Sequence, residues 1–467
     1  MTIATDLANR ICALTFDTLP PEAVHWARVG IIDTIGVTLA GAIEPCAVLA
    51  RRVAAPAPGN ALLFGTATRT APAEAAWVNG TASHALDFDD CSNTLGGHPS
   101  APVLPALFAL ADGTALSGRA LITAYIAGFE TETRIAHAVN FYHYEKGWHP
   151  TATLGVFGAA AACASLLRLT PEQTATALAI AASFSSGLKA NFGTMTKPLH
   201  VGQSGRNGLV AALLAREGFT ASFDAMEHPQ GFFRVFNGEG NFDADAVLRD
   251  WGAPLDIVTP GIAIKQYPCC GSTHPAVDAM LHLVRQHRLK PEQVERVVSR
   301  THKRRLRHTN RPHLRSALDA KFSVQYCLAR ALLDGRVVLS QFEGEAHEDP
   351  RITDLMARIE ATPQPDVIPD DGKHFGADVE VFTKDGSRYA HSVEQPLGRT
   401  SENPLPQWEL EAKFLDCAQR SVTADAAEQA LALLRRFDAV PRVAAVTDIL
   451  ATGILATGCA PGAMQEG

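Results

Sequence analysis

The sequence predicts a mainly α-helical protein, with a large all-helical domain built from both chain ends and a smaller α+β domain between them. Three observations support this class. Apolar residues recur at helical spacing up to about residue 260. Short β-branched runs alternate with helical patterns after Lys265, and helical Ala/Leu-rich sequence returns after Pro406. The predicted domains are therefore 1–264 with 401–467, and 265–400.

The helices of the first part have recognisable ends. One helix begins near Pro21 and stops near Gly41, with Pro in its first turn and Gly at its end. Thr170 as N-cap, Pro171 in the first turn and Gln173 three residues on mark another start. Further helices are predicted over 73–84 and 101–111, from Ser117, and over 207–217. No convincing strand precedes residue 260, so we expect a helical bundle.

Strands are predicted only in the middle of the chain. Residues 294–301 are β-branched and short. Residues 377–394 alternate around Asp385-Gly386, which is a signal for a type I′ hairpin turn. The remaining predictions are helices over 275–287, 318–333 and 409–434, and a Pro- and Asp-rich surface connection over 362–372.

Composition excludes several classes of protein. The 467 residues are 46% apolar, which indicates a globular chain with a large core. A net charge of -8 argues against nucleic acid as a partner. The longest apolar stretch, 154–167, falls short of the roughly 18 residues of a membrane span, so no membrane partner is expected. The absence of a signal-peptide pattern and nine scattered cysteines favour reduced thiols and a cytoplasmic location.

The most polar short run in the sequence is HALDFDDCSNTLGGHPSAPVLP, residues 84–105. It holds three carboxylates, two histidines and the Cys91 thiol between apolar flanks. Carboxylates beside imidazoles in a partly buried loop are typical of proton-transfer sites. The alternative is a capping loop, in which Asp90 or Ser92 caps a helix and Gly96-Gly97 forms a turn.

Three other motifs carry candidate groups. His149 precedes an Ala-rich helix within an aromatic cluster, where Tyr144 is a candidate proton donor. Lys197 and Arg206 could bind a substrate carboxylate, Arg206 at the start of a helix, or they could be surface cations. The basic run ending at His308 could line a cleft for an acidic substrate or form a solvated face.

Lys265 stands in KQYPCCGSTHP, where the helical pattern gives way to the α+β pattern. Junctions between domains are preferred places for small-molecule sites. A Cys-Cys…His zinc site there would lack a second spaced ligand pair, so no metal site is predicted. The sequence also has no Gly-rich phosphate loop, no G-x-S-x-G and no H-E-x-x-H, which excludes the common nucleotide-binding, serine-hydrolase and zinc-protease classes.

In their order along the chain, four motifs resemble the MmgE/PrpD family, namely HALDFDD…HPSAPVLPALFALA, GWHPTATLGVFGAAAA, TKPLHVGQSGRNG and KQYPCCGSTHP. The resemblance covers the whole chain. It implies a large all-helical domain made from both chain ends plus a smaller α+β lid. Known members include 2-methylcitrate dehydratases, cis-aconitate decarboxylases and an iminodisuccinate epimerase. It also implies a small di- or tricarboxylate substrate, no metal or organic cofactor, and a homodimer.

Matched by motif, the family's active-site positions fall on Asp87, His98, His149, Lys197 and Lys265. Two departures weigh against decarboxylation of cis-aconitate. Cys91 stands where the decarboxylase pattern has Thr, and His308 stands where that pattern has Tyr.

The predicted function is cofactor-independent proton abstraction and return at the carbon alpha to a carboxylate of a small polycarboxylate. Epimerisation of an iminodisuccinate-like amino-polycarboxylate is the first choice. The alternatives are a 2-methylcitrate-type dehydratase, a cis-aconitate-type decarboxylase, and a non-catalytic small-acid-binding protein. The predicted catalytic residues are His98, His149, Lys265, Asp87 and Tyr144, and the predicted substrate-binding residues are Lys197, Arg206, His308 and Cys91.

Overall fold

The computed structural model describes residues 2–54, 57–365 and 375–455, and it confirms a mainly α-helical fold. The chain forms two compact units, which we describe separately. The helical unit consists of residues 1–262 with 410–467, and the second unit of residues 263–409. The predicted boundaries were 264/265 and 400/401.

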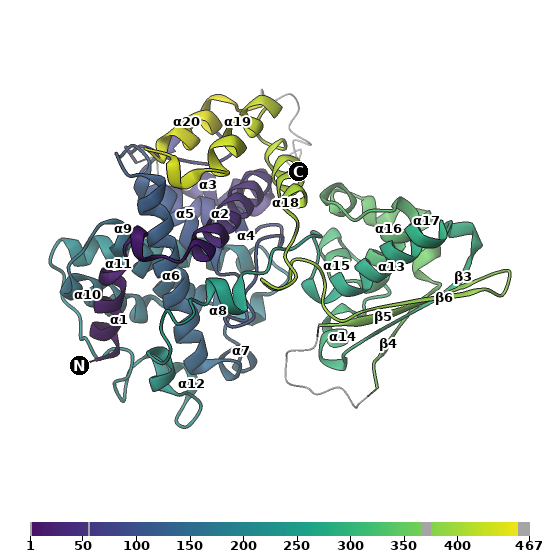
Figure 1. The fold of residues 1–467 in the computed structure, drawn as a ribbon, viewed down its shortest axis with the longest axis horizontal. Coiled ribbons are helices and arrows are strands. Elements are labelled where there is room, and N and C mark those ends of the chain that lie inside the picture. The colour runs from purple at the N-terminus through teal and green to yellow at the C-terminus, as the bar shows by residue number, and fades with distance from the viewer. Residues whose placement is uncertain (1, 55–56, 366–374, 456–467) are drawn as a thin grey trace, which may run out of the picture. The chain divides into compact units, whose positions relative to one another are not determined.

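The helical unit is a bundle of long and short helices (Figure 1). They are α1 (Ile3–Ala13), α2 (Pro21–Gly41), α3 (Pro45–Val53), α4 (Pro72–His84), α5 (Ser100–Ala111), α6 (Gly118–Val139), α7 (Tyr142–Lys146), α8 (Pro150–Thr153), α9 (Gly155–Leu166), α10 (Pro171–Phe184), α11 (Thr196–Arg216), α12 (Phe232–Asn237), α18 (Gln407–Ala418), α19 (Ala424–Leu434) and α20 (Ala444–Thr452). The expectation of no strand before residue 260 was wrong, because Ala61–Leu62 and Arg69–Thr70 pair as β1 and β2.

Small residues let the central helices approach closely. A Cβ atom on Gly80 of α4 would lie 2.8 Å from the Gly202 Cα atom of α11. On Gly202 it would lie 2.2 Å from the Trp77 carbonyl oxygen. Helix α11 also passes α9, where a Cβ atom on Gly208 would lie 2.5 Å from the Ala159 methyl carbon. Glycines therefore allow α11 to lie against both α4 and α9.

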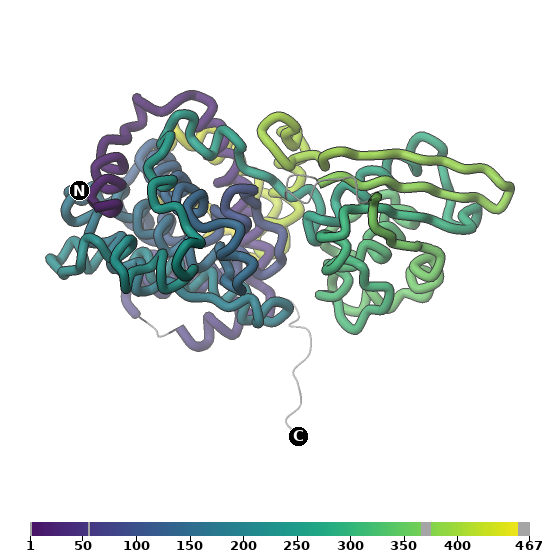
Figure 2. The backbone as a smooth tube through the Cα atoms, turned by 90° about the horizontal axis from the view of Figure 1, so that it is seen from below, coloured from purple at the N-terminus to yellow at the C-terminus, as the bar shows by residue number. Residues whose placement is uncertain are grey.

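The C-terminal helices complete the helical unit. Figure 2 shows the yellow C-terminal segment within the same body as the purple N-terminal segment. Lys413 of α18 lies 2.6 Å from Asp33 Oδ1 of α2, and both side chains are buried. The Lys413 ammonium also donates to the Phe88 carbonyl oxygen at 2.8 Å. The end of the chain thus fixes the loop that follows α4.

The second unit has a four-stranded sheet in the order β4-β3-β5-β6. Strand β3 (Val294–Thr301) is parallel to β4 (Ile359–Pro363) and antiparallel to β5 (Ala377–Thr383), which pairs with β6 (Arg388–Val393). Helices α13 (His274–His287) and α16 (Val324–Asp334) pack against the sheet (Figures 1 and 2). The shorter helices are α14 (Lys303–Thr309), α15 (Ala317–Lys321) and α17 (Pro350–Met356).

The hairpin was predicted at the right place but with the wrong turn. A type I′ turn needs positive φ at both central residues, and here Gly386 has φ 86° while Asp385 is not in that region. Thr383 N–H donates to the Ser387 carbonyl, and Gly386 N–H donates to the Thr383 carbonyl. The loop is therefore one residue longer and ends at a left-handed glycine. Of the predicted connection 362–372, the first two residues belong to β4, and 366–372 lie outside the described residues.

Membrane-spanning length was tested on the described helices. None of them alone is long and apolar enough to span a membrane. Helices α2 and α3 together have the length and apolar composition of a span, but the chain bends by 81° between them.

Candidate active site

The polar loop lies between His84, the last residue of α4, and Ser100, the first residue of α5. Ser92 pairs with Gly97 across it, and Gly96 has φ 63°, which favours glycine. A Cβ atom on Gly97 would lie 2.7 Å from the Thr151 Oγ1 atom of α8. That same hydroxyl accepts the His98 N–H at 3.1 Å. The Gly-Gly pair therefore brings His98 close to the start of α8, which follows His149.

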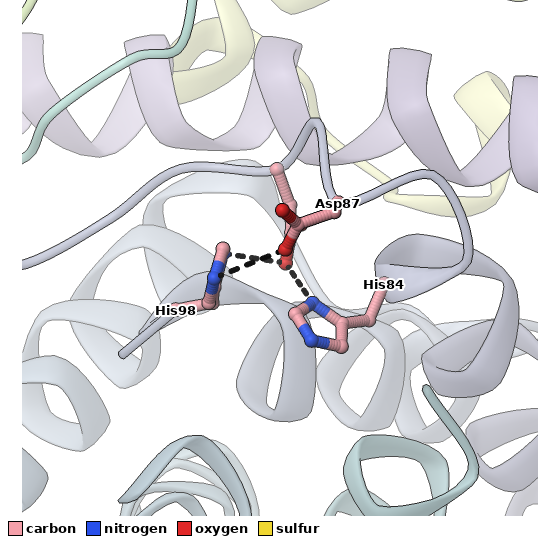
Figure 3. A group of neighbouring side chains, drawn as sticks. His84, Asp87 and His98 are labelled. Atoms are coloured by element: carbon pink, nitrogen blue, oxygen red, sulfur yellow. Dashed lines mark hydrogen bonds and ion pairs between the residues drawn. The ribbon is translucent and has the colours of Figure 1, made fainter. Parts of the chain in front are cut away.

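Two carboxylates of the loop bind two imidazoles (Figure 3). Asp89 Oδ2 lies 2.7 Å from His84 Nδ1 and 3.2 Å from His98 Nδ1. His98 Nε2 lies 3.6 Å from Asp87 Oδ1, and the Lys197 ammonium of α11 lies 2.6 Å from the same oxygen. The loop thus joins two histidines, two aspartates and one lysine, and all five side chains are mostly buried.

Asp87 has an unusual backbone conformation. Its φ is 54°, in the left-handed region, which non-glycine residues seldom adopt and which Asp tolerates better than most. Such conformations cost about 1 kcal/mol or more and cluster at functional sites. The ion pair with Lys197 holds the carboxylate in this position.

His149 lies beside this group as the N-cap residue of α8, and it is 2% exposed. Its Nδ1 atom is 3.4 Å from His200 Nδ1 of α11. Its ring centroid is 5.7 Å from that of His84 and 4.9 Å from that of Phe192. Residues far apart in the chain therefore converge here. Glycines bring α4 against α11, and the loop residue Gly187 lies against both α8 and His200.

Burial and charge set the protonation of these groups. Burial lowers the pKa of His84 to about 4, and it lowers the pKa of His149 well below the ordinary value, helped by the charge of Lys197. Burial would raise the pKa of Asp89, but the imidazoles of His84 and His98 outweigh it and hold that pKa well below its usual range. At neutral pH, Asp89 is an anion and both His84 and His149 are neutral.

Four of the predicted site residues lie together, namely Asp87, His98, His149 and Lys197. Cys91 is adjacent, with its thiol sulfur 3.9 Å from His98 Nδ1. Tyr144 lies on α7, where its ring contacts the Lys189 ammonium at 3.3 Å.

The Arg206 prediction needs a correction. This residue does not open a helix, because α11 begins ten residues earlier at Thr196. The predicted start at 207 was wrong because GQSGRNG supplies glycines for close packing and not for a loop. The Arg206 guanidinium lies 3.5 Å from Glu74 Oε1 of α4, which compensates part of its charge.

Lys265 and His308 belong to the second unit. Lys265 is 6% exposed, and His308 Nε2 lies 3.1 Å from Ser272 Oγ. The helix predicted over 275–287 is confirmed, since α13 runs from His274 to His287.

Sequence reasoning missed three members of the cluster: His84, Asp89 and His200. His84 and Asp89 stand in the same polar run as the predicted residues, but no local pattern says which carboxylate of DFDD faces the imidazoles. His200 is three residues after Lys197 on α11, and this spacing would have placed both on one helix face had the helix start been recognised.

The cluster could also be considered as a cation site. One donor atom from each of His84, Asp87, Asp89 and His98 lies within 4.8 Å of the others. However, the ammonium of Lys197 already contacts Asp87, and it would repel a divalent cation placed beside it. We therefore interpret the cluster as a hydrogen-bonded acid–base network.

These features define a two-unit, mainly helical protein with a buried acid–base network in its helical unit. Residues 5–245 match the MmgE/PrpD N-terminal domain, and residues 267–439 match the MmgE/PrpD C-terminal domain. The chain belongs to the MmgE/PrpD family.

Individual relatives cover most of the chain. It is 29% identical to the cis-aconitate decarboxylase of Homo sapiens over 463 residues, which are 96% of this chain and 94% of the relative. It is also 29% identical to the cis-aconitate decarboxylase of Aspergillus terreus over 446 residues, with 88% of each chain covered. The identity to the 2-methylcitrate dehydratase of Escherichia coli is 26% over 425 residues, which are 82% of this chain and 84% of the relative.

Proposed function

We propose that the protein is a cofactor-independent lyase that acts on a small di- or tricarboxylate, with decarboxylation of a cis-aconitate-like acid as the first candidate. The observation that carries this proposal is the contact of Lys197 and His98 with the same Asp87 oxygen. A cation and an imidazole side by side suit an acidic substrate whose reaction needs a proton donor.

The proposed reaction uses these groups as follows. An ammonium has three N–H donors, and Asp87 occupies one, so Lys197 can also bind a substrate carboxylate. The C–C bond to a second carboxylate breaks, CO2 leaves, and the electron pair stays on carbon. His98 in its protonated form delivers a proton to that carbon, and solvent replaces the proton afterwards. Buried cations stabilise the charge on the intermediate more strongly than water would.

The relatives support a lyase better than the epimerase that the sequence first suggested. Those reported above are named as decarboxylases and dehydratases. Two of these three are decarboxylases, and they have the higher identity and coverage. We therefore propose the lyase reaction in place of epimerisation.

Dehydration is the second candidate. Cys91 beside His98 is the observation that favours it, because this thiol replaces the hydroxyl expected in the decarboxylase pattern. In a dehydratase, one imidazole removes a proton from carbon while another protonates the leaving hydroxyl.

Incubation with a panel of di- and tricarboxylates in D2O, followed by NMR and CO2 capture, tests the proposal. Decarboxylation releases CO2 and leaves one deuterium on the product carbon. Dehydration gives a new alkene without CO2. Deuterium exchange with scrambled stereochemistry and neither of these products would restore the epimerase. Binding without turnover across the panel would favour the non-catalytic alternative. The matched control is His98→Asn, which should keep the fold and abolish either lyase reaction.

A further inference from the structure

We propose that Asp89 is a positioning residue that fixes the tautomer of His98, so that Nε2 of His98 is the nitrogen that exchanges protons with the substrate. This inference rests on the proposed acid–base role of His98 and adds a residue that neither the motifs nor the family match identified.

The geometry leaves little choice of tautomer. One oxygen of Asp89 lies within 3.2 Å of Nδ1 in both His84 and His98. A carboxylate oxygen can only accept hydrogen bonds, so each Nδ1 carries the proton that faces it. In a neutral imidazole the lone pair is then on Nε2. For His98 this atom lies 3.6 Å from Asp87 Oδ1, beyond hydrogen-bond distance, so the 3.2 Å contact of Nδ1 with Asp89 decides the tautomer.

His84 provides an independent sign of the same arrangement. It is 1% exposed, and its Nε2 atom has no hydrogen-bond partner among the described residues. An unprotonated Nε2 is the expected state of a neutral imidazole whose Nδ1–H donates to Asp89. A buried N–H without an acceptor would cost more than a bare lone pair. His84 and Asp89 therefore form a rigid support behind His98.

The neighbouring Asp90 is a contrast within the same loop. Both aspartates are 0% exposed, yet Asp90 contacts no imidazole in the described hydrogen bonds. Its carboxyl group bonds to the Ser100 hydroxyl and to the Ser100 N–H at 3.3 Å. Burial raises the pKa of Asp90 well above its usual range, in contrast to that of Asp89. An asparagine at position 90 keeps an oxygen that can accept from the Ser100 hydroxyl, whereas an asparagine at position 89 loses the negative charge that faces two imidazoles.

The experiment compares Asp89→Asn with Asp90→Asn in the full-length protein. We expect Asp89→Asn to lower kcat by about 10²-fold or more with a small change in KM, because an amide permits the wrong tautomer. We expect Asp90→Asn to stay within about threefold of the parental kcat, because the amide keeps an oxygen for the Ser100 hydroxyl and Asp90 bonds to no imidazole in the described hydrogen bonds.

The pH profile separates positioning from a general structural role. The charged groups that face His98 are Asp87 and Asp89 from the loop and Lys197 from α11, with the neutral His84 from α4 and His149 from α8 close by. An anion stabilises the protonated imidazole that serves as proton donor, so its removal in Asp89→Asn should move the alkaline limb of kcat/KM to lower pH. Asp90→Asn should leave that limb in place.

Imidazole ¹⁵N NMR of the parent protein tests the inference without any substrate. We expect both His84 and His98 in the Nδ1–H form, with these two N–H signals kept in Asp90→Asn and lost or shifted in Asp89→Asn. His98 in the Nε2–H form, or an Asp89→Asn variant within threefold of parental kcat, would overturn the inference. Since the NMR result needs no turnover, failure of the proposed lyase function would be seen separately. The NMR spectrum of the parent protein also tests the tautomer of His98 if Asp89→Asn does not fold.

Discussion

At the scale of single residues, the site places buried side chains with oppositely shifted pKa values and opposite charges next to one another. Two imidazoles hold the pKa of Asp89 well below its usual range, whereas burial raises the pKa values of Asp90 and Glu132 well above theirs. Lys197 keeps its contact with Asp87 in a place where solvent scarcely reaches. In this environment each charge acts on its neighbours more strongly than it would in water.

Replacing Lys197 should remove turnover while leaving the fold intact. In Lys197→Met, the substrate carboxylate loses its cation and Asp87 loses its ion pair with the lysine. We expect kcat/KM to fall by about 10²–10³-fold. Lys146→Met on α7, where the lysine is exposed, should be silent in the same steady-state assay. Retention of more than a tenth of the activity in Lys197→Met would contradict the proposed role.

Replacing Glu132 should change how stability depends on pH. This residue is 0% exposed, neither of its carboxyl oxygens has a partner among the described residues, and burial raises its pKa well above the ordinary value of 4.5. The folded protein therefore keeps a proton that the unfolded chain releases above that value, so Glu132 destabilises the fold increasingly as pH rises. In urea unfolding, the free energy of unfolding of Glu132→Gln relative to that of the parent should be higher at pH 8 than at pH 5. An equal difference at both pH values would contradict this.

Residue types in the motifs predicted most of the cluster but not its internal contacts. Asp87, His98, His149 and Lys197 were found because they stand in polar motifs between apolar flanks and because those motifs resemble the MmgE/PrpD family. The partners Asp89 and His200 were not, because a loop with φ 54° at Asp87 orients its side chains in ways that spacing does not reveal. The roles of Lys265, His308, Tyr144 and Arg206 remain predictions.

At the scale of elements, the glycines of α11 set the position of Lys197 and His200. Caps and prolines predicted the ends of α2 and α10 well, since these are local signals. The start of α11 was missed because its glycines serve interhelical contact, and that contact is visible only once α4 and α9 are in place. The type I′ turn predicted at Asp385-Gly386 was wrong because the loop is one residue longer than the dipeptide indicates.

Gly202→Ala should therefore destabilise the helical unit although alanine favours helices. The added methyl group would lie 2.3 Å from Thr81 Oγ1 and 2.2 Å from the Trp77 carbonyl oxygen. The backbone of α4 would have to shift to make room for this methyl group. Overpacking of this kind lowers the free energy of unfolding by about 1–3 kcal/mol, which urea unfolding measures. Arg216→Ala, at the exposed end of the same helix, should change stability by less than about 0.5 kcal/mol. If Gly202→Ala were as stable as the parent, the close contact would be wrong.

At the scale of the whole molecule, the helical unit is closed by segments from both ends of the chain. The return to helical sequence after Pro406 predicted this order of elements. It could not predict that Lys413 would bind Asp33 and the carbonyl of Phe88, because a lone lysine in an amphipathic helix more often faces solvent.

Lys413→Met should be strongly destabilising. Removing one partner of a buried ion pair leaves Asp33 without its cation, which costs about 3–5 kcal/mol in chemical unfolding. Addition of Asp33→Asn should recover much of that loss. Arg435→Met, which breaks a solvent-exposed pair with Glu411 in the same C-terminal segment, should cost less than about 1 kcal/mol. A Lys413→Met variant no weaker than Arg435→Met would disprove the role of this contact.

The tie between Lys413 and Phe88 also bears on biosynthesis. A ribosome delivers the first 262 residues, with Asp33 and the histidine loop, long before Lys413 emerges. Until then the nascent chain has to keep Asp33 hydrated or protonated, and the segment around Phe88 lacks its anchor. A translation product truncated after the second unit should accordingly be a substrate for chaperones and proteases, even though its acid–base residues have all been made.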